Sequence, residues 1–392
     1  PAHTPPDPLP GGHPNTSVGA APGRDRGVGP AFTAIAPCRA VPGPRFYNRG
    51  MSKPFDCCIR GAGIVGRTLA LHLAAKQLRV ALVTQGSVPA APGQDVRAYA
   101  LNAASRALLE GVRGWPDHQA ATPVQVMQVQ DDGGGEVVFT ASETGSEALN
   151  WIVDVPALES RLADAVRFQP LIELVDTPQS AALHVICEGK ASATREEWGA
   201  EWDATPYGQW ALATRVQATQ AHAQTAHQWF HQGDILALLP LGGATGNHYA
   251  VVWSLTPERA QSLQSQSESD FCAALQEASH NAVGTLSLTA ERKIWPLQHA
   301  LARRWSGTSA QGPWVLAGDA AHAMHPLAGQ GLNVGLADVA ELVRVLTTRP
   351  YWRSVGDSRL LRQYERARKA DFALMGQAND ALQQLFTNPS TT

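Results

Sequence analysis

Gly61-Ala62-Gly63-Ile64-Val65-Gly66 lies between the short apolar run 55–60 and the alanine-rich apolar run 64–76. We predict a strand over 55–60, a helix over 64–76 and a second strand over 79–83, where the sequence is apolar again. A strand, glycine turn, helix and strand within about 30 residues is the setting in which this glycine spacing binds a dinucleotide. These residues therefore predict a Rossmann-like α/β domain.

The three glycines of this turn have separate expected roles. Gly61 makes the tight turn, Gly63 lets the backbone approach a pyrophosphate, and Gly66 lets the helix pack on the strand. The unpaired N–H groups at the start of the helix favour an anion there. Glycine-rich turns also form for packing alone, but the flanking strand and helix favour ligand binding.

One part of the usual dinucleotide site differs in this chain. An Asp or Glu about 20 residues after the glycines ordinarily accepts hydrogen bonds from the ribose hydroxyls. Thr84, followed by Gln85, stands at that position. Either side chain can hydrogen-bond a ribose, but without the charge of a carboxylate, a difference of about 1 kcal/mol. We expect Thr84 to hold the adenosine end of the ligand less tightly than an acid would.

A second glycine-bearing region follows the apolar run 314–317. It comprises Gly318-Asp319-Ala320-Ala321-His322, Pro326 and Gly329-Gln330-Gly331-Leu332-Asn333. A carboxylate placed as Asp319 is can accept two hydroxyl donors from a sugar-alcohol chain, and its alternative role is a helix cap. A ligand long enough to touch both glycine regions is a dinucleotide, and FAD fits best.

The composition is that of a globular enzyme. The chain has 392 residues, of which 44% are hydrophobic and 17% charged, and its net charge is −3. That length allows one large α/β domain with an inserted sheet, and the charge provides no field that would recruit nucleic acid. Five cysteines without metal-ligand spacing indicate a reducing compartment. No apolar stretch approaches the roughly 20 residues needed to cross a bilayer, so we expect a soluble or peripherally attached protein.

Residues 1–50 differ from the rest of the chain. They are rich in Pro and Gly and lack apolar periodicity, which predicts a disordered extension. Their arginines suggest a transit peptide as an alternative, but no amphipathic helical pattern spans them. Met51 stands directly before the first predicted strand, and we expect it to be the natural start.

The remaining elements follow from periodicity. Apolar residues spaced by three and four predict helices over 154–168, 332–346 and 357–386, and a turn followed by a helix over 97–115. Between 207 and 255 the period becomes alternating, which predicts an antiparallel sheet inserted into the α/β framework. Buried strands are predicted at 184–187 and 314–317.

Three other features are weaker candidates for chemistry. His322 and His325 are three residues apart, but Pro326 ends any helix there and no acidic ligand is adjacent, so no metal site is expected. Ser192 lacks the glycine context of a hydrolase nucleophile. Trp295-Pro296-Leu297 is expected in the core or a pocket wall.

The order of these motifs resembles that of the FAD-dependent hydroxylases of ubiquinone biosynthesis, the 2-polyprenylphenol hydroxylase family. These are single-component flavin monooxygenases related to p-hydroxybenzoate hydroxylase. The resemblance extends from about residue 55 to 386. Besides the two glycine regions it is carried by Arg97–Asn102 (RAYALN), Tyr207–Gln209 (YGQ) and Leu239–Leu241 (LPL).

The resemblance implies a domain organisation. An FAD-binding monooxygenase domain would span 51–390, with a Rossmann-like FAD-binding part, an inserted and mostly antiparallel substrate-binding sheet, and C-terminal helices. The FAD-binding parts would lie at about 51–130, 150–200 and 290–350, the sheet at about 200–290, and the last helix at 357–386.

The resemblance also implies which residues contact the cofactor. Gly61, Gly63 and Gly66 would contact the FAD pyrophosphate, and Asp319 the ribitol. Glu188 begins a second fingerprint, 188–195, where the family has Asp-Gly-x-x-Ser-x-x-Arg and binds both FAD and reduced nicotinamide. The further predicted cofactor-binding residues are Thr84, Arg97 near the flavin, and Pro326, Gly329, Gly331, Leu332 and Asn333 beside its isoalloxazine.

The family's reaction uses NAD(P)H to reduce FAD and then O₂ to form a C4a-hydroperoxide, which hydroxylates an electron-rich phenol. Because the cofactor carries this chemistry, no catalytic side chain is expected. The implied substrate is a polyprenylated phenol. Two alternatives stay open: a flavin hydroxylase of another small aromatic molecule, and a non-catalytic family member in a biosynthetic complex, as the replaced acids at 84 and 188 suggest.

The expected location is the cytoplasm, with no nucleic acid partner. Peripheral association with the inner membrane or with a ubiquinone-biosynthesis complex is left open. Arg362, Arg366, Arg368 and Lys369 on the last predicted helix are a candidate surface for anionic headgroups, and a solvated charged face is the alternative.

Overall fold

The computed structural model describes residues 54–85, 95–131, 133–324 and 331–387, with side chains to 374. The chain divides into two units, 1–52 and 53–392, and the fold below is that of the second. The predicted disordered extension at 1–50, its proposed start at Met51, and the predicted site residues Pro326 and Gly329 lie outside the described residues.

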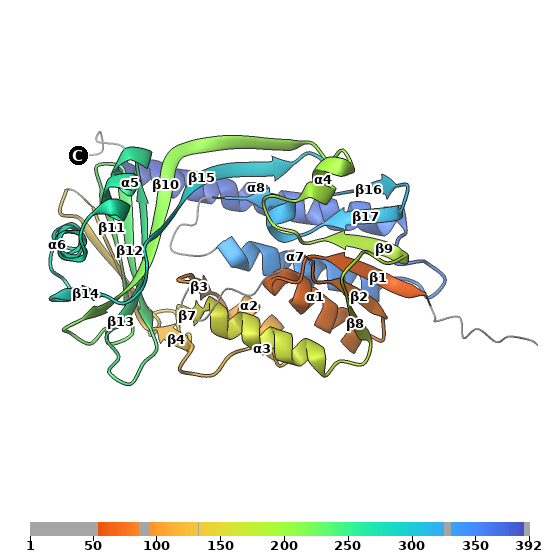
Figure 1. Ribbon diagram of the computed structural model, residues 1–392, viewed down its shortest axis with the longest axis horizontal. Helices are drawn as coiled ribbons and strands as arrows, with labels where there is room; N and C mark the ends of the chain where they lie inside the picture. The colour runs from red at the N-terminus through yellow and green to blue at the C-terminus, as the bar shows by residue number, and fades with distance from the viewer. Residues whose placement is uncertain (1–53, 86–94, 132, 325–330, 388–392) are drawn as a thin grey trace, which may run out of the picture. The chain divides into compact units, whose positions relative to one another are not determined.

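The strand, turn, helix and strand predicted around the first glycines are present. β1 (Phe55–Arg60) leads through the turn into α1 (Ile64–Ala75), and β2 (Val80–Val83) pairs with β1 in parallel. These strands belong to a six-stranded sheet in the order β16 (Ser306–Ser309), β17 (Gly312–Leu316), β9 (Ala181–Ile186), β1, β2 and β8 (Ile172–Val175) (Figure 1). The β16–β17 pair is antiparallel and the others are parallel.

Four helices and this sheet share the main core. They are α1, α3 (Val155–Arg167), α7 (Gly331–Thr347) and α8 (Ser358–Thr387), and the last three occupy the ranges predicted for helices. Asp154 caps α3, since its Oδ1 accepts a hydrogen bond of 3.0 Å from the N–H of Ala157. Fully buried side chains from each helix meet here, including Leu73, Leu162, Leu342 and Tyr364.

A nine-stranded sheet is inserted into this framework, and its central strands lie where alternation predicted them. Its order is β18 (His322–Ala323), β15 (Lys293–Ala302), β10 (Trp202–Ala218), β13 (His248–Leu255), β12 (Asp234–Leu241), β11 (Thr225–His231), β5 (Val126–Gln130) and β6 (Glu136–Thr140), with β14 (Leu286–Leu288) paired to β10. The β5–β11 pair is parallel and the other pairs are antiparallel.

One face of the nine-stranded sheet forms a second core with α5 (Pro257–Ser265) and α6 (Glu268–Ala278). Trp253 of the sheet and Phe271 of α6 are fully buried in it. The long strands β10 and β15 run from this sheet toward the six-stranded sheet (Figure 1). The sheet also includes strands outside 200–290, namely β5, β6, β15 and β18.

A third sheet of three strands was not predicted. It consists of β3 (Ala98–Leu101), β7 (Asn150–Asp154) and β4 (Ala121–Val124), all antiparallel, and β3 leads into α2 (Ala103–Glu110). The expected turn at the start of 97–115 was therefore wrong. Four residues are too few to show a period, and β3 is a strand because β7, about 50 residues later in the chain, pairs with it.

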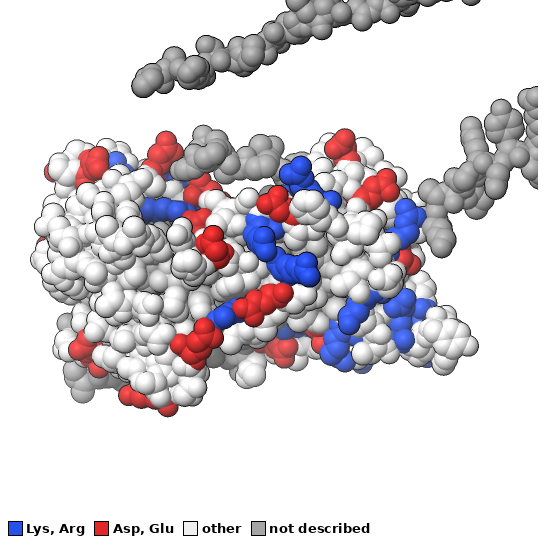
Figure 2. All heavy atoms as spheres, turned by 90° about the horizontal axis from the view of Figure 1, so that it is seen from below, with Lys and Arg blue, Asp and Glu red and all other residues white. Residues whose placement is uncertain are grey.

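The surface carries charges of both signs. On the face drawn in Figure 2, basic and acidic side chains are interspersed among uncharged residues. None of the helices in the described part of the chain is long and apolar enough to cross a membrane. Arg368, predicted for a headgroup-facing surface, is only 3% exposed, so that part of the prediction was wrong.

Candidate functional site

A cavity of about 270 Å³ brings the two glycine regions together. Strands of the three-stranded and nine-stranded sheets contribute to its wall, together with the segments that follow β1, β9 and β17 of the six-stranded sheet. The wall is formed by 63–65, 96–99, Glu159, Cys187, Gly189, Lys190, Ala213, 250–252, Trp295, Leu297, 317–319, 322–324 and 331–332.

The three glycines of the first turn differ in their surroundings. A Cβ atom at Gly61, whose φ is +103°, would lie 2.4 Å from the carbonyl oxygen of Cys187, and one at Gly66 would lie 1.9 Å from that of Gly61. A Cβ atom at Gly63 would have no described atom within 4 Å, and Gly63 lines the cavity. Gly61 and Gly66 are thus required by packing, while Gly63 leaves room for a ligand to approach the N-terminus of α1.

The second glycine region packs directly on the first. Gly318 has φ +64°, and a Cβ atom there would lie 3.2 Å from Cγ2 of Val65. A Cβ atom at Gly335 of α7 would lie 3.0 Å from the same methyl group. Val65 therefore fits between two glycines, and Asp319, in the short 3₁₀ helix η1 (Gly318–Ala320), enters the wall of the same cavity.

A buried acid holds the loop around Asp319 in place. Asp338 of α7 is completely buried, and its Oδ2 accepts hydrogen bonds from the N–H of Gly318 at 2.8 Å and from Nε2 of His322 at 2.6 Å. Its Oδ1 accepts from Nε of Arg368 at 2.7 Å. Burial alone would raise the pKa of Asp338, but its interactions with His322 and Arg368 outweigh burial and lower that pKa.

Sequence reasoning did not single out Asp338, and it considered Arg368 only as part of an exposed basic surface, not as a buried partner of an acid. A signal was present, because an acid at 338 interrupts the apolar stripe of a helix whose neighbours Val334 and Leu342 are buried. His322, considered earlier for metal binding, is bonded to this acid instead. Within the described ranges, no three His, Cys, Asp or Glu side chains are grouped so as to hold a metal ion.

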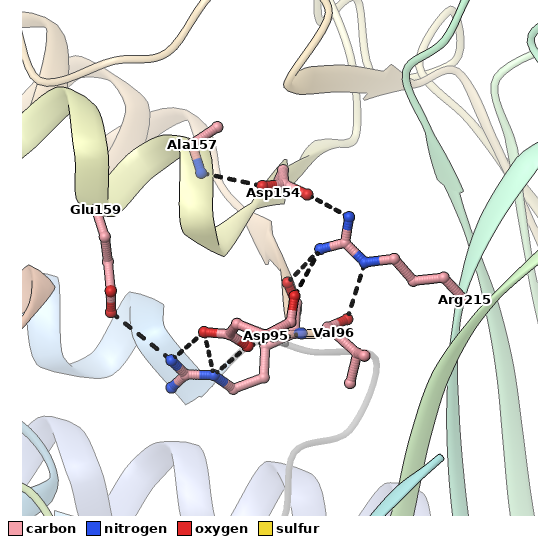
Figure 3. Close-up of polar contacts among 7 residues, drawn as sticks. Asp95, Val96, Asp154, Ala157, Glu159 and Arg215 are labelled. Carbon is pink, nitrogen blue, oxygen red and sulfur yellow. Dashed lines mark hydrogen bonds and ion pairs between the residues drawn. The ribbon is translucent and has the colours of Figure 1, made fainter. Parts of the chain in front are cut away.

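Arg97 lies in the cavity wall, where it meets two carboxylates. Its Nε donates to Oδ1 of Asp95 at 2.8 Å, and its Nη2 lies 3.7 Å from Oε1 of Glu159 in α3 (Figure 3). The hydrogen bond to Asp95 raises the pKa of Arg97 above its ordinary value. Tyr99 lines the cavity beside Arg97, and burial raises the pKa of its hydroxyl. Sequence reasoning did not single out Asp95 or Glu159, and it named Tyr99 only as part of the motif at 97–102.

Two predicted site residues make their polar contacts elsewhere. Oε2 of Glu188 accepts from Oγ of Ser192 at 2.7 Å, and Oε1 accepts from Oγ1 of Thr194 at 2.7 Å, so the carboxylate closes its own loop before α4 (Ala193–Glu197). Asn333 is buried, donating to the carbonyl of Ala100 at 2.8 Å. It joins α7 to β3, while its neighbours Gly331 and Leu332 line the cavity.

Thr84 also lies apart from the cavity wall. It follows β2, and its Oγ1 is 3.4 Å from the carbonyl oxygen of Val175 and 3.5 Å from Oδ1 of Asp176. An acid is therefore present at this edge of the sheet, but it comes from the end of β8.

The part of the wall that comes from β10, β13 and β15 is apolar. Ala213, Ala250 and Val252 present small side chains from β10 and β13, and Trp295 and Leu297 come from β15. The expectation that 295–297 contribute to a pocket wall is confirmed for Trp295 and Leu297. An elongated ligand along the glycines would therefore leave an apolar space beside it.

Comparison with known proteins agrees with this geometry. The family model of the FAD binding domain matches residues 175–377, just over half of the chain. The chain is 29% identical over 365 residues to 3-demethoxyubiquinol 3-hydroxylase of Escherichia coli (strain K12), covering 86% of this chain and 91% of that protein. It is 28% identical over 362 residues to the ubiquinone hydroxylase UbiL of Rhodospirillum rubrum, covering 86% and 82%.

The fold is also that of a solved protein. The crystal structure of pqsL, a probable FAD-dependent monooxygenase from Pseudomonas aeruginosa, superposes with a TM-score of 0.70 at 20% identity. The match covers 85% of this chain and 97% of that one. This similarity supports the Rossmann-like architecture with an inserted sheet.

Proposed function

Because this chain belongs to the FAD binding domain family and is an FAD-dependent aromatic monooxygenase, we propose that it hydroxylates a polyprenylated phenol in ubiquinone biosynthesis. The observation that carries the proposal is the shared cavity: Gly63 and Asp319, about 250 residues apart in the chain, both line it, together with apolar side chains from the nine-stranded sheet.

The residues present fit FAD. The open side of Gly63 and the N-terminus of α1 would receive the pyrophosphate, and the carboxylate of Asp319 would accept hydrogen bonds from the ribitol hydroxyls. Bound FAD would be reduced by NAD(P)H and would supply the transfer of one oxygen atom from O₂ to the ring of the phenol. The protein's task is to bind and orient the cofactor and the substrate and to exclude water from the reaction.

The substrate side of the cavity suits an apolar phenol. Its sheet-derived wall offers methyl and isopropyl groups and one indole, which can exclude water from an aromatic ring. Arg97, Tyr99 and His322 supply the polar groups nearby. The names of the two relatives above point to a ubiquinone precursor as the phenol.

We further propose that the enzyme works in the cytoplasm and takes its substrate at the inner membrane surface or within a ubiquinone-biosynthesis complex. A polyprenyl tail partitions into lipid, so a hydroxylase of such a phenol must approach that surface. Flotation with vesicles containing the prenylated phenol, compared with vesicles lacking it, tests this proposal. Equal flotation of the protein with both would contradict it.

The activity itself is tested with purified protein. Absorption spectroscopy with and without added FAD should show a bound flavin, and NAD(P)H oxidation should be stimulated by a polyprenylated phenol. Mass spectrometry of the product under ¹⁸O₂ should show one labelled oxygen atom. If protein that holds FAD oxidises NAD(P)H no faster with any prenylated phenol than without phenol, the proposed substrate is rejected. Stimulation of NAD(P)H oxidation by a small phenol alone would favour another aromatic substrate.

A further inference from the structure

Arg215 joins the nine-stranded sheet to the segment that carries Arg97. It lies near the C-terminal end of β10 and pairs with Ala250 of the cavity wall. Its guanidinium crosses to the third sheet, where Nη1 forms an ion pair of 2.6 Å with Oδ2 of Asp154 (Figure 3).

The same guanidinium binds three successive backbone carbonyls. Nε donates to Val96 at 3.4 Å, and Nη2 donates to Asp95 and to Arg97, each at 3.3 Å. These residues precede β3, and the carbonyl of Arg97 also accepts a hydrogen bond of 3.3 Å from the N–H of Val155. A planar group with five donors can satisfy several carbonyls at once, which a lysine ammonium at the end of a flexible chain cannot.

The contacts of Arg215 lead to the side chain of Arg97 by two routes. Asp154, the partner of Arg215, caps α3, and Glu159 on the next turn of α3 faces the guanidinium of Arg97. Asp95, whose carbonyl is bound by Arg215, accepts from Arg97 through its carboxylate. Arg215 thus contacts the backbone on both sides of Val96 directly, and it is linked to Asp95 and Glu159, the two carboxylates around the side chain of Arg97, through the Asp95 backbone and through the α3 cap Asp154.

We propose that Arg215 is a positioning residue that holds 95–97, and with it the guanidinium of Arg97, in the cavity wall beside the flavin. The inference rests on the proposed function, in which Arg97 lies near the flavin. Arg215 itself is not among the residues that line the cavity, so it acts through Arg97.

A double-mutant cycle tests this inference. Arg215→Gln, Arg97→Gln and the double variant are purified with FAD, and kcat for phenol-stimulated NAD(P)H oxidation and the absorption maximum of bound FAD are measured. Each single variant should lower kcat by about tenfold, and the double variant should be no slower than Arg97→Gln alone, because residues that act through one another are not additive. Both single variants should shift the absorption maximum of bound FAD in the same direction, and the double variant should shift it no further than either single variant does.

Arg215→Lys separates positioning from charge. It keeps a cation beside Asp154 but loses the planar set of donors, so its kcat should fall as in Arg215→Gln while its melting temperature stays near that of the wild type. Asp154→Asn is the second route if the Arg215 variants fail to fold, and it should reproduce the same kcat loss. Arg259→Gln is the matched control: Arg259 pairs with Asp234, neither residue lines the cavity, and kcat should not change.

Three results are distinguishable. Losses of kcat and spectral shifts that add in the double variant, or a wild-type kcat in Arg215→Lys, overturn the inference while leaving the activity intact. A wild-type protein that binds FAD but oxidises no NAD(P)H with phenols overturns the proposed function, and the spectral cycle still decides the role of Arg215. A protein that binds no FAD overturns both.

Discussion

Gly63 and Gly66 show how far a single residue's role depends on what surrounds it. Both belong to the same sequence motif, yet one faces open space in the cavity and the other faces the carbonyl of Gly61. Gly63→Ala should therefore fold, because replacing a helix N-cap glycine lowers the free energy of unfolding by about 1 kcal/mol or less. The new methyl group should obstruct binding of the pyrophosphate. We expect FAD affinity to fall at least tenfold, measured by fluorescence titration.

Two companion variants complete this comparison. Gly66→Ala should not yield folded protein, because its Cβ would lie 1.9 Å from a backbone oxygen. Gly111→Ala, after α2, is the control, since its Cβ would have ordinary contacts of 3.4 Å and no part in the cavity. Unchanged FAD affinity in Gly63→Ala would argue against a pyrophosphate at this turn.

Asp319 carries the second single-residue prediction. Asp319→Asn keeps the shape of the side chain but removes the charge that strengthens hydrogen bonds from hydroxyl donors. FAD affinity should fall by about tenfold, corresponding to about 1.4 kcal/mol. Asp164→Asn, an exposed acid of α3 outside the cavity wall, should bind FAD as the wild type does. Equal titration curves for the two variants would exclude the ribitol contact.

At the scale of elements, Asp338 fastens η1, α7 and α8 together. Asp338→Asn leaves Arg368 buried opposite a neutral amide, which should lower the free energy of unfolding by about 3–5 kcal/mol at neutral pH. Urea denaturation measures this loss. Asp371→Asn is the matched control, because Asp371 pairs with the same Arg368 but is exposed, and its loss should stay within about 1 kcal/mol.

The same acid predicts a pH dependence. Since the folded-state pKa of Asp338 is lowered, its contribution to stability is complete above the ordinary carboxyl pKa of about 4 and is lost as pH falls through the folded value. The wild type should therefore lose stability more steeply below about pH 4 than Asp338→Asn does. Parallel stability curves for the two proteins in that range would show that Asp338 does not titrate on unfolding.

At the scale of the whole molecule, the cavity exists only in the folded chain. Its wall combines segments near residues 63, 97, 189, 250 and 319, so FAD should bind the folded state alone. FAD at a hundredfold excess over its Kd should raise the free energy of unfolding by about 2.7 kcal/mol. FMN at the same concentration should stabilise the folded protein less than FAD, because FMN lacks the second nucleotide that extends past the glycine turn. An equal rise in melting temperature with FMN and with FAD would contradict a dinucleotide site.

Local patterns were sufficient for the parts of this fold that lie close together in sequence. The unit from β1 to β2, the helices α3, α7 and α8, and the central strands of the inserted sheet appear where periodicity placed them. The third sheet was not predicted, because β3 forms a strand only by pairing with β7, about 50 residues later in the chain. Gly63, Arg97, Asp319, Gly331 and Leu332, which were predicted to bind the cofactor, line one cavity, and their contacts with FAD stay predictions.

By itself, the sequence determined the class of ligand and the framework, since glycine spacing, apolar period and an acid after a buried strand are local constraints on the backbone. Tertiary structure alone decided that Val65 fits between Gly318 and Gly335, that Asp338 holds the loop of Asp319, and that Arg215 reaches the backbone below Arg97. These contacts join residues far apart in the chain, and their energies depend on distance in space and on burial, which no local pattern records.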